Sequence, residues 1–395
     1  IETFSLKHYE AGIGTIAFAW DKHNGIAFNC DYKPKDEPVV INKSTSIYAD
    51  NVVNLEVRKL LLDFFKSYKG TIIWHNASFD ASVLVYQLFM VSLIDQEGLL
   101  EGIKHMTSNI HDTKIIAYLA TNSCAGNKLS LKDQAHEFAG NYAVDEIKDI
   151  TKVEPKKLLR YNLVDCLATW FVFEKHYDTM VKDEQLDIYE NLMLPSITTI
   201  VQMQLTGMCM DMGKVIEAED KLTDIYNNHL LGMMACSFIK EFENSLRETK
   251  VISDNKTLKT KVRSIADVLH IKFNPNSNPQ LQELLYKVMG LPVLDTTANK
   301  QPATGGKTIK KLLNHTNIPE YKVFLEHLIG FIKVDKILSA FIPTFKKAPK
   351  APDGYHYLFG GFNLGGTVSG RLSSSKPNLQ QIHSGSTFSK LIRPC

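Results

Sequence analysis

The period of the apolar residues changes near residue 185, and this change constrains the fold more than any other feature of the sequence. Before it, short β-rich runs alternate with helical spacing; after it, helical spacing continues with few strand signals. Alternation of this kind predicts helices packed on a sheet, whereas continuous helical spacing predicts a helical bundle. We therefore expect an α/β domain over 1–185, a helical region over 186–346 and, after a linker rich in Pro and Lys, a β segment over 354–395.

The expected elements follow from apolar periodicity and from the turn residues between the periodic segments. In the first part, two β-rich runs flank a short polar turn, and helical spacing and a short apolar strand come next. We expect strands over 13–20, 25–30 and 71–74 and helices over 52–68, 80–90, 112–119, 129–139 and 155–176. In the later part we expect helices over 213–248, 278–289, 307–315 and 320–342, and strands within 354–369.

The composition is that of an ordinary globular protein. Apolar residues make up 44% of the chain and charged residues 22%, which excludes a disordered chain. The apolar runs fall short of the roughly 18 residues that a membrane helix needs, so we expect no membrane partner. The six cysteines form no C-x-x-C pair, which favours reduced thiols over a disulfide framework or a zinc site.

Positive charge is concentrated toward the end of the chain. From Lys333 onward there are nine Lys or Arg and two Asp, a net charge of +7. Because the whole chain carries +2, the preceding residues carry −5. A basic segment joined to an acidic body suits a protein that holds a polyanion at one end and cations at the other. A solvated basic surface would give the same distribution.

Acidic and polar residues at three places in the first part are candidates for a single site. Glu2 precedes the first β-rich run, and Asp80 follows the strand expected over 71–74 within the sequence H-N-x-x-F-D. Tyr161 and Asp165 lie four residues apart on an expected helix, so they share one face. Carboxylates are ligands that Mg²⁺ prefers, and two such ions can activate a water for phosphodiester cleavage. These residues therefore indicate a two-metal hydrolytic site in which Tyr161 orients the water.

Each of these residues also has a purely structural interpretation. An Asp on a helix is commonly a solvated charge, and a buried Tyr is commonly a packed ring with a tethered hydroxyl. His75 and Asn76, directly after the strand, suit an ordinary turn. The ordered set of residues, rather than any single one, favours a catalytic site.

This set resembles the 3′–5′ exonuclease domain of proofreading DNA polymerases, the DEDD class with a tyrosine in its third motif. Asn76 and Asp80 match the second motif and Tyr161 and Asp165 the third, while Glu2 matches the Glu of the first motif, D-x-E. The resemblance implies a ribonuclease H-like α/β fold, with one metal held by the first-motif Asp, Glu2 and Asp165, and a second shared by Asp80. It also implies that Asn76 helps to place the DNA strand. We expect the first-motif Asp one residue before the present start.

The C-terminal segment carries the longest motif. Residues 367–382 read T-V-S-G-R-L-S-S-S-K-P-N-L-Q-Q-I and are very similar to the T-x-T-G-R-L-S-S-x-x-P-N-L-Q-N-I signature of family A DNA polymerases. Arg371 can donate to minor-groove acceptors that all base pairs share. Hydroxyl and amide side chains suit phosphates and base edges, and a lysine adds salt-dependent affinity. The expected DNA contacts are Asn76, Arg371, Ser373, Ser374, Lys376, Asn378 and Gln380.

The resemblance to family A spans almost the whole chain and is closest to phage-type members. It implies a DNA-directed DNA polymerase with 3′–5′ proofreading exonuclease, acting in DNA replication in the cytoplasm of a phage host. It further implies Mg²⁺, which Mn²⁺ can replace, primer–template DNA and single-stranded 3′ ends as partners, dNTPs for the full-length protein and a possible processivity factor.

The family's polymerase carboxylates lie after the T-G-R-L-S-S segment. The chain is therefore expected to hold the exonuclease, the thumb and the start of the palm without the polymerising site. Two other interpretations stay open. One is a stand-alone 3′–5′ exonuclease with a helical nucleic-acid clamp, and the other is a non-catalytic DNA-binding half of a split or truncated polymerase.

Overall fold

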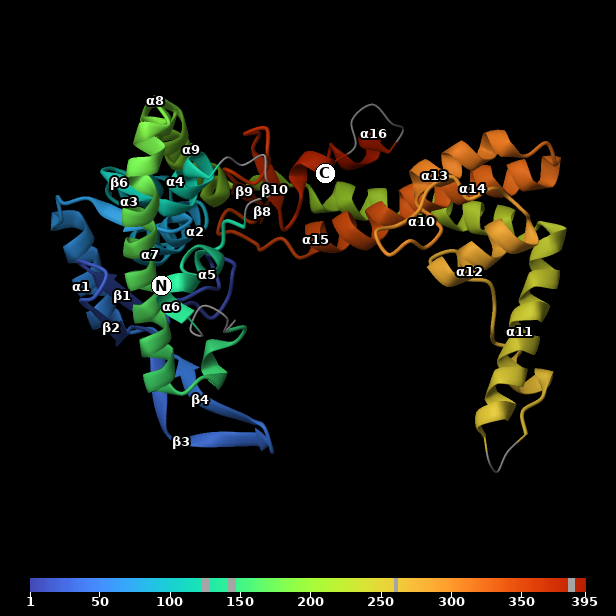
Figure 1. Cartoon of the computed structure of the whole chain (residues 1–395), viewed down its shortest axis with the longest axis horizontal. Helices are drawn as coiled ribbons and strands as arrows, with labels where there is room; N and C mark the ends of the chain where they lie inside the picture. The colour runs from blue at the N-terminus through green and yellow to red at the C-terminus, as the bar shows by residue number, and fades with distance from the viewer. Residues whose placement is uncertain (122–127, 141–146, 259–261, 383–387) are drawn as a thin grey trace. The chain divides into compact units, whose positions relative to one another are not determined.

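The computed structural model describes residues 1–121, 128–140, 147–258, 262–382 and 388–395 (Figure 1). The chain forms two compact units. Unit 1 consists of Ile1–Met210 and Ala348–Ile382, and unit 2 consists of Asp211–Lys347 with the described part of His383–Cys395. The domain limits expected from the sequence stay predictions.

The described strands all lie in unit 1 and pair two by two. The antiparallel pairs are β1 (Thr15–Ala19) with β2 (Gly25–Asn29), β3 (Tyr32–Asn42) with β4 (Thr45–Asn51), β7 (Met208–Met210) with β8 (His356–Leu358), and β9 (Gly361–Asn363) with β10 (Ser373–Ser375). The one parallel pair in the described chain is β5 (Ile72–Trp74) with β6 (Ile110–Asp112). These strands form separate two-stranded sheets, so the ribonuclease H-like fold is not confirmed and stays a prediction.

The helices of unit 1 begin at recognisable sequence signals. The side chain of Asn54 accepts a hydrogen bond from the Val57 N–H at the start of α1, and Pro155 occupies the first turn of α7. The helices are α1 (Leu55–Ser67), α2 (Ala77–Leu84), α3 (Gln96–Met106), α4 (Thr113–Ala120), α5 (Leu131–Gln134), α6 (His136–Ala139), α7 (Pro155–Lys182), α8 (Leu186–Ile188) and α9 (Leu194–Thr206). Helical turns η1 (Val85–Phe89), η4 (Ile150–Lys152), η5 (Tyr189–Met193) and η10 (Leu379–Gln381) complete the unit.

The main core of unit 1 joins the first hairpin to α1–α4 and α9. Ile16 of β1, Leu84 of α2, Leu99 of α3, Ile116 of α4 and Val201 of α9 are each almost completely buried in this cluster. Burying a side chain of this size stabilises the fold by about 1.5–3 kcal/mol. Because α2 packs in this core directly after β5, the position of its first turn is fixed by apolar contacts on several sides.

Unit 2 is mostly helical in its described residues, with one isolated β-bridge between Thr296 and Pro302. Its helices are α10 (Met212–Met234), α11 (Ser237–Thr257), α12 (Asn278–Gln282), α13 (Gly306–Leu312), α14 (Pro319–Lys336), α15 (Ile342–Lys346) and α16 (Ser389–Ile392), with shorter turns η6 (Ile265–Val268), η7 (Glu283–Val288), η8 (Leu313–His315) and η9 (Ile337–Phe341). Phe324, Leu328 and Phe331 of α14 are fully buried in its core. No helix in the described part of the chain is both long enough and apolar enough to span a bilayer.

Most expected elements are present, with several differences, among them the helix α3 and the strand β6, which were not expected. The helix expected over 213–248 is two helices, because the chain leaves the helical conformation at Cys236. The helix expected over 129–139 is likewise divided into α5 and α6. The hairpin of β3 and β4 was not expected, because Pro34 and Pro38 interrupt the alternation of apolar residues and its register shifts between Pro34 and Val39.

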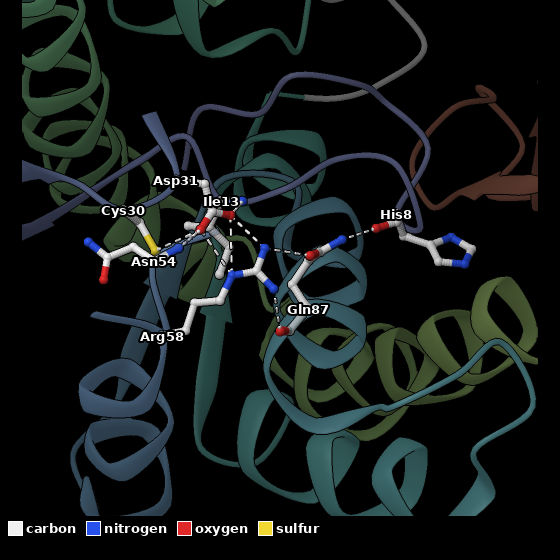
Figure 2. Close-up of polar contacts among 7 residues, drawn as sticks. All are labelled: His8, Ile13, Cys30, Asp31, Asn54, Arg58 and Gln87. Carbon is white, nitrogen blue, oxygen red and sulfur yellow. Dashed lines mark hydrogen bonds and ion pairs between the residues drawn. The ribbon is translucent and has the colours of Figure 1, made fainter. Parts of the chain in front are cut away.

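A buried ion pair connects the first hairpin to α1 and η1 (Figure 2). The carboxylate of Asp31 is fully buried and pairs with the Arg58 guanidinium, with an Nη2–Oδ2 distance of 2.5 Å. Asp31 also accepts hydrogen bonds from the backbone N–H groups of Ile13 and Asn54. Arg58 donates to the side-chain and backbone oxygens of Gln87, whose amide donates to the His8 carbonyl oxygen. Four segments of unit 1 are therefore held by one network.

We expect Asp31→Ala to lower the free energy of unfolding of unit 1 by about 3–5 kcal/mol, because it leaves a mostly buried Arg58 without its counter-charge. Urea denaturation followed by tryptophan fluorescence measures this, since the three tryptophans, Trp20, Trp74 and Trp170, all lie in unit 1. The control is Lys59→Ala, which breaks an exposed pair with Asp63 and should cost no more than about 0.5 kcal/mol. Equal losses in the two variants would contradict the prediction.

Candidate active site

The structure brings the three predicted carboxylates to one cavity. Glu2 pairs with Thr15 at the edge of β1, Asp80 lies in the first turn of α2, and Asp165 lies on α7. All three line a cavity of about 1030 Å³, here called the carboxylate cavity. Its wall also contains apolar and aromatic side chains of β1, β2, α1 and β5. Three segments that are far apart in sequence thus meet at one site.

Burial and mutual repulsion raise the pKa values of these carboxyl groups. Burial is the largest cause for each, and it raises the pKa of Glu2 to about 7 and of Asp165 to about 6. The charges of Asp165 and Asp80 raise the pKa of Glu2 further. The pKa of Asp80 is also raised, although the Ile1 ammonium donates a hydrogen bond of 3.2 Å to its Oδ1 atom. The cavity therefore concentrates negative charge that lacks full compensation, as at many functional sites.

Two further side chains act on Asp165. The buried Tyr161 makes a side-chain hydrogen bond to the Asp165 carboxyl group, and this bond lowers the pKa of that group. The Lys132 ammonium of α5 lies 5.0 Å from the centre of the Tyr161 ring, and its charge lowers the pKa of both Asp165 and Glu2. Lys132 was not among the predicted residues, because a lysine on a short helix with no motif around it gives no sequence signal.

The donor set suits a hard divalent cation in chemistry and in charge, since it consists of carboxylates. The fit is incomplete in geometry: no group of three or more His, Cys, Asp or Glu side chains in the described residues lies close enough together to enclose an ion. A cationic group, the Ile1 ammonium, lies beside Asp80. The carboxylates therefore share a cavity without forming a closed coordination shell.

Asp112, at the end of β6, fixes the start of α2. This carboxylate is 3% exposed and accepts hydrogen bonds from the backbone N–H groups of Asn76, Ala77 and Lys114 at 2.8–3.1 Å. Its own N–H donates to the hydroxyl of Tyr189. Negative charge at a helix N-terminus is favourable, so Asp112 stabilises the turn that carries Asp80. Asp112 was not among the predicted site residues, because β6 was not expected and its parallel pairing with β5 appears only in the structure.

Asn76 and His75 have internal partners. Asn76 takes a left-handed conformation with φ of 68°, and its Oδ1 atom accepts a hydrogen bond of 2.9 Å from Lys114 Nζ. His75 contacts the Thr113 hydroxyl through Nδ1 and the Leu129 carbonyl oxygen through Nε2. Burial lowers the pKa of His75 to about 4. His75 is therefore a satisfied turn residue, while the DNA-binding role of Asn76 stays a prediction.

The T-G-R segment, residues 367–382, lies partly on β10 and η10 and contributes nothing to the lining of the carboxylate cavity. The Ser374 hydroxyl is buried, donates to the Pro377 carbonyl oxygen and accepts from the Leu379 N–H. Gln380 donates to the Leu372 carbonyl oxygen at 3.0 Å. These two side chains stabilise the conformation of the segment through internal hydrogen bonds. Their contacts with DNA stay predictions.

The other predicted contacts of this segment differ in exposure. Arg371 and Lys376 are exposed, and Ser373 is half-buried on β10. The Oδ1 atom of Asn378 is buried and has no hydrogen-bond partner among the described residues. The segment therefore exposes two cations, Arg371 and Lys376, and their contact with DNA stays a prediction.

Comparison with known proteins finds relatives in one family. Residues 244–395 match the family model described as DNA polymerase family A. The chain is related to the family A DNA polymerases. It is 24% identical over 395 residues to the DNA polymerase of Escherichia phage T5, covering 95% of this chain and 41% of that protein. It is 26% identical over 286 residues to the DNA polymerase I of Helicobacter pylori, covering 72% of this chain and 26% of that protein.

A second phage relative and a solved structure agree with this family. The DNA polymerase of Bacillus phage SP01 is 24% identical over 357 residues, covering 82% of this chain and 35% of that protein. The solved structure is the POL domain of Pol1 from M. smegmatis in complex with DNA primer–template and dNTP. It is similar in fold, with a TM-score of 0.59 and 17% identity over all of this chain and 53% of that one. The resemblance to family A is confirmed, and the chain spans less than half the length of these three curated relatives.

The raised pKa of Asp165 predicts a pH dependence of stability in metal-free buffer. A carboxyl group whose pKa is higher in the folded state stabilises the fold below its unfolded pKa, and that contribution is lost as pH rises. For Asp165 the loss falls between about pH 4 and pH 6, and it should be roughly 1–3 kcal/mol.

Asp165→Asn should therefore make unit 1 more stable at pH 8 by roughly 1–3 kcal/mol and flatten its dependence on pH. Urea denaturation at several pH values, in the presence of a chelator, measures both effects. Asp178→Asn, an exposed position on the same helix, is the control. An unchanged pH slope in Asp165→Asn would contradict the prediction.

Proposed function

We propose that this chain is the exonuclease and primer–template-binding part of a phage-type family A DNA polymerase with 3′–5′ proofreading. The observation that carries this proposal is the meeting of Glu2, Asp80 and Asp165 in one cavity, with Tyr161 hydrogen-bonded to Asp165. The family relationship supports the polymerase part of the proposal. The same proposal includes a ribonuclease H-like fold for the α/β part. It also includes activity in the cytoplasm of a phage host.

In the proposed reaction, a water attacks the terminal phosphodiester of a single-stranded 3′ end. Glu2, Asp80 and Asp165 would hold Mg²⁺, or Mn²⁺ in its place, which when bound polarises the phosphodiester and lowers the pKa of water. Glu2 is partly protonated near neutral pH, because its pKa is about 7. Loss of that proton would accompany cation binding, since an ionised carboxylate is the better ligand.

The surrounding side chains would orient the attacking water, balance the phosphate charge and keep Asp80 in place. The Tyr161 hydroxyl, fixed by its bond to Asp165, is suited to orient the attacking water. The Lys132 ammonium lies near enough to lower the pKa of two cavity carboxyl groups, so it is also suited to balance phosphate charge. Asp112 keeps Asp80 in place through the first turn of α2.

The T-G-R segment would hold primer–template DNA. Ser374 and Gln380 fix its backbone from within, so the exposed Arg371 is presented on an ordered loop. The solved structure with a similar fold was determined with DNA primer–template and dNTP, which supports DNA as the partner. dNTPs and a processivity factor would be partners of the full-length protein.

One observation favours a second candidate, a non-catalytic DNA-binding part of a polymerase. The described carboxylates do not form a closed group of three metal ligands. A chain with this cavity could bind DNA through the T-G-R segment without cutting it, and the same experiment separates the two candidates.

We expect Asp80→Ala and Asp165→Ala each to lower Mg²⁺-dependent digestion of a 3′-mismatched primer roughly 1,000-fold, because each removes a ligand whose effect on the transition state is several kcal/mol. Binding to primed DNA should be nearly unchanged. The control is Asp178→Ala, an exposed acidic position on α7. Full activity in both cavity variants would refute the assignment.

The assay should use the chain as it stands and the same chain preceded by Asp, which restores the D-x-E motif. If both bind primed DNA and neither digests it, the non-catalytic candidate is favoured.

We expect Arg371→Ala to weaken binding to primed duplex by about 1–2 kcal/mol, and to weaken binding to single strands less, because only a duplex arranges these acceptors along a minor groove. Fluorescence anisotropy at fixed salt measures both affinities. Lys350→Ala, another exposed cation of unit 1, is the control. Equal losses on both substrates would show that Arg371 is only a phosphate contact.

A further inference from the structure

Two histidines of unit 2 face each other between two of its helices that pack together. His229 lies on α10 and His327 on α14, and their Nδ1 atoms are 3.2 Å apart. The ring planes are inclined by 68°, with centroids 5.5 Å apart. Both side chains are half-buried. The pair is separate from the carboxylate cavity, which lies in unit 1.

Each ring rests on a glycine of the opposite helix. A Cβ atom added at Gly232 of α10 would lie 2.3 Å from the His327 ring, and one added at Gly330 of α14 would lie 2.3 Å from the His229 ring. The arrangement is reciprocal, because each helix carries H-x-x-G at this point. The two glycines thus provide the space in which both imidazoles meet.

We propose that His229 and His327 bind one late first-row divalent metal ion, such as Zn²⁺, through their Nδ1 atoms. Two nitrogens each about 2.05 Å from a tetrahedral zinc ion lie about 3.3 Å apart, and the observed separation is 3.2 Å. Imidazole nitrogen is a preferred ligand for these ions and a poor one for Mg²⁺. The site would therefore select a different class of metal from the carboxylate cavity.

The remaining ligand positions of such an ion are open. No third His, Cys, Asp or Glu completes a cluster within the part of the chain that the structure describes, so water would fill the remaining positions. A bound ion would join α10 to α14 and restrain their relative movement.

The test is zinc binding to the full chain by titration calorimetry, with Co²⁺ absorption as a report of coordination geometry. In His229→Gln and in His327→Gln we expect the binding of one equivalent of Zn²⁺ to be lost, or its affinity to fall at least roughly tenfold. His270→Gln, an exposed histidine of the same unit, should bind as the unchanged chain does. Circular dichroism confirms that each variant is folded.

A second variant removes the site without removing a ligand. Gly232→Ala places a methyl group against the His327 ring and should also weaken zinc binding roughly tenfold. The control is Gly213→Ala, near the start of α10, where the added methyl group meets only a side-chain oxygen at 3.3 Å. Zinc should slow hydrogen exchange in α10 and α14 of the unchanged chain alone.

Two results would overturn the proposal. One is zinc affinity that is the same in the histidine variants as in the unchanged chain, which would place the ion elsewhere. The other is no zinc binding by the folded chain, which would leave a hydrogen-bonded histidine pair at a helix contact.

Discussion

The position of the candidate active site depends on Asp112. This buried carboxylate accepts three backbone hydrogen bonds, two of them from the first residues of α2, and its own N–H is tied to Tyr189. It therefore links β6, α2 and η5 at one point. Because an unpaired charge at this depth would be strongly unfavourable, these hydrogen bonds favour the observed position of the start of α2, whose first turn carries Asp80.

Unit 1 contains two kinds of buried carboxylate: one kind is held by internal partners, and the other lines the candidate active site. Asp31 and Asp112 have their oxygens fully engaged, the first with Arg58 and two N–H groups, the second with three N–H groups. Glu2 and Asp165 face a cavity, where burial is the largest cause of their raised pKa values and the charge of Asp80 raises both further. Burial raises the pKa of Asp112 as well, so what distinguishes Glu2 and Asp165 is that they line a cavity that a cation or a proton could enter.

Metal chemistry in this chain is proposed at two places with opposite ligand character. The carboxylate cavity in unit 1 offers oxygen donors, and the histidine pair in unit 2 offers nitrogen donors. Mg²⁺ prefers oxygen donors, and Zn²⁺ binds well to imidazole nitrogen. A solution that contains both ions could therefore supply both sites. In each case the backbone positions the ligands. The first turn of α2 carries Asp80 into the carboxylate cavity, and two glycines leave room for the histidine rings.

Local signals in the amino-acid sequence were enough to predict the first hairpin, α1, β5 and α7. They also predicted that Tyr161 and Asp165 share one helix face, and the T-G-R motif relates the chain to family A. Tertiary structure alone decided the rest, because it depends on contacts between residues far apart in sequence. Lys132 meets Tyr161 and Asp165 only after α5 packs against α7, and His229 meets His327 across 98 positions of the chain. No periodicity or motif encodes such meetings, since they follow from how whole helices pack.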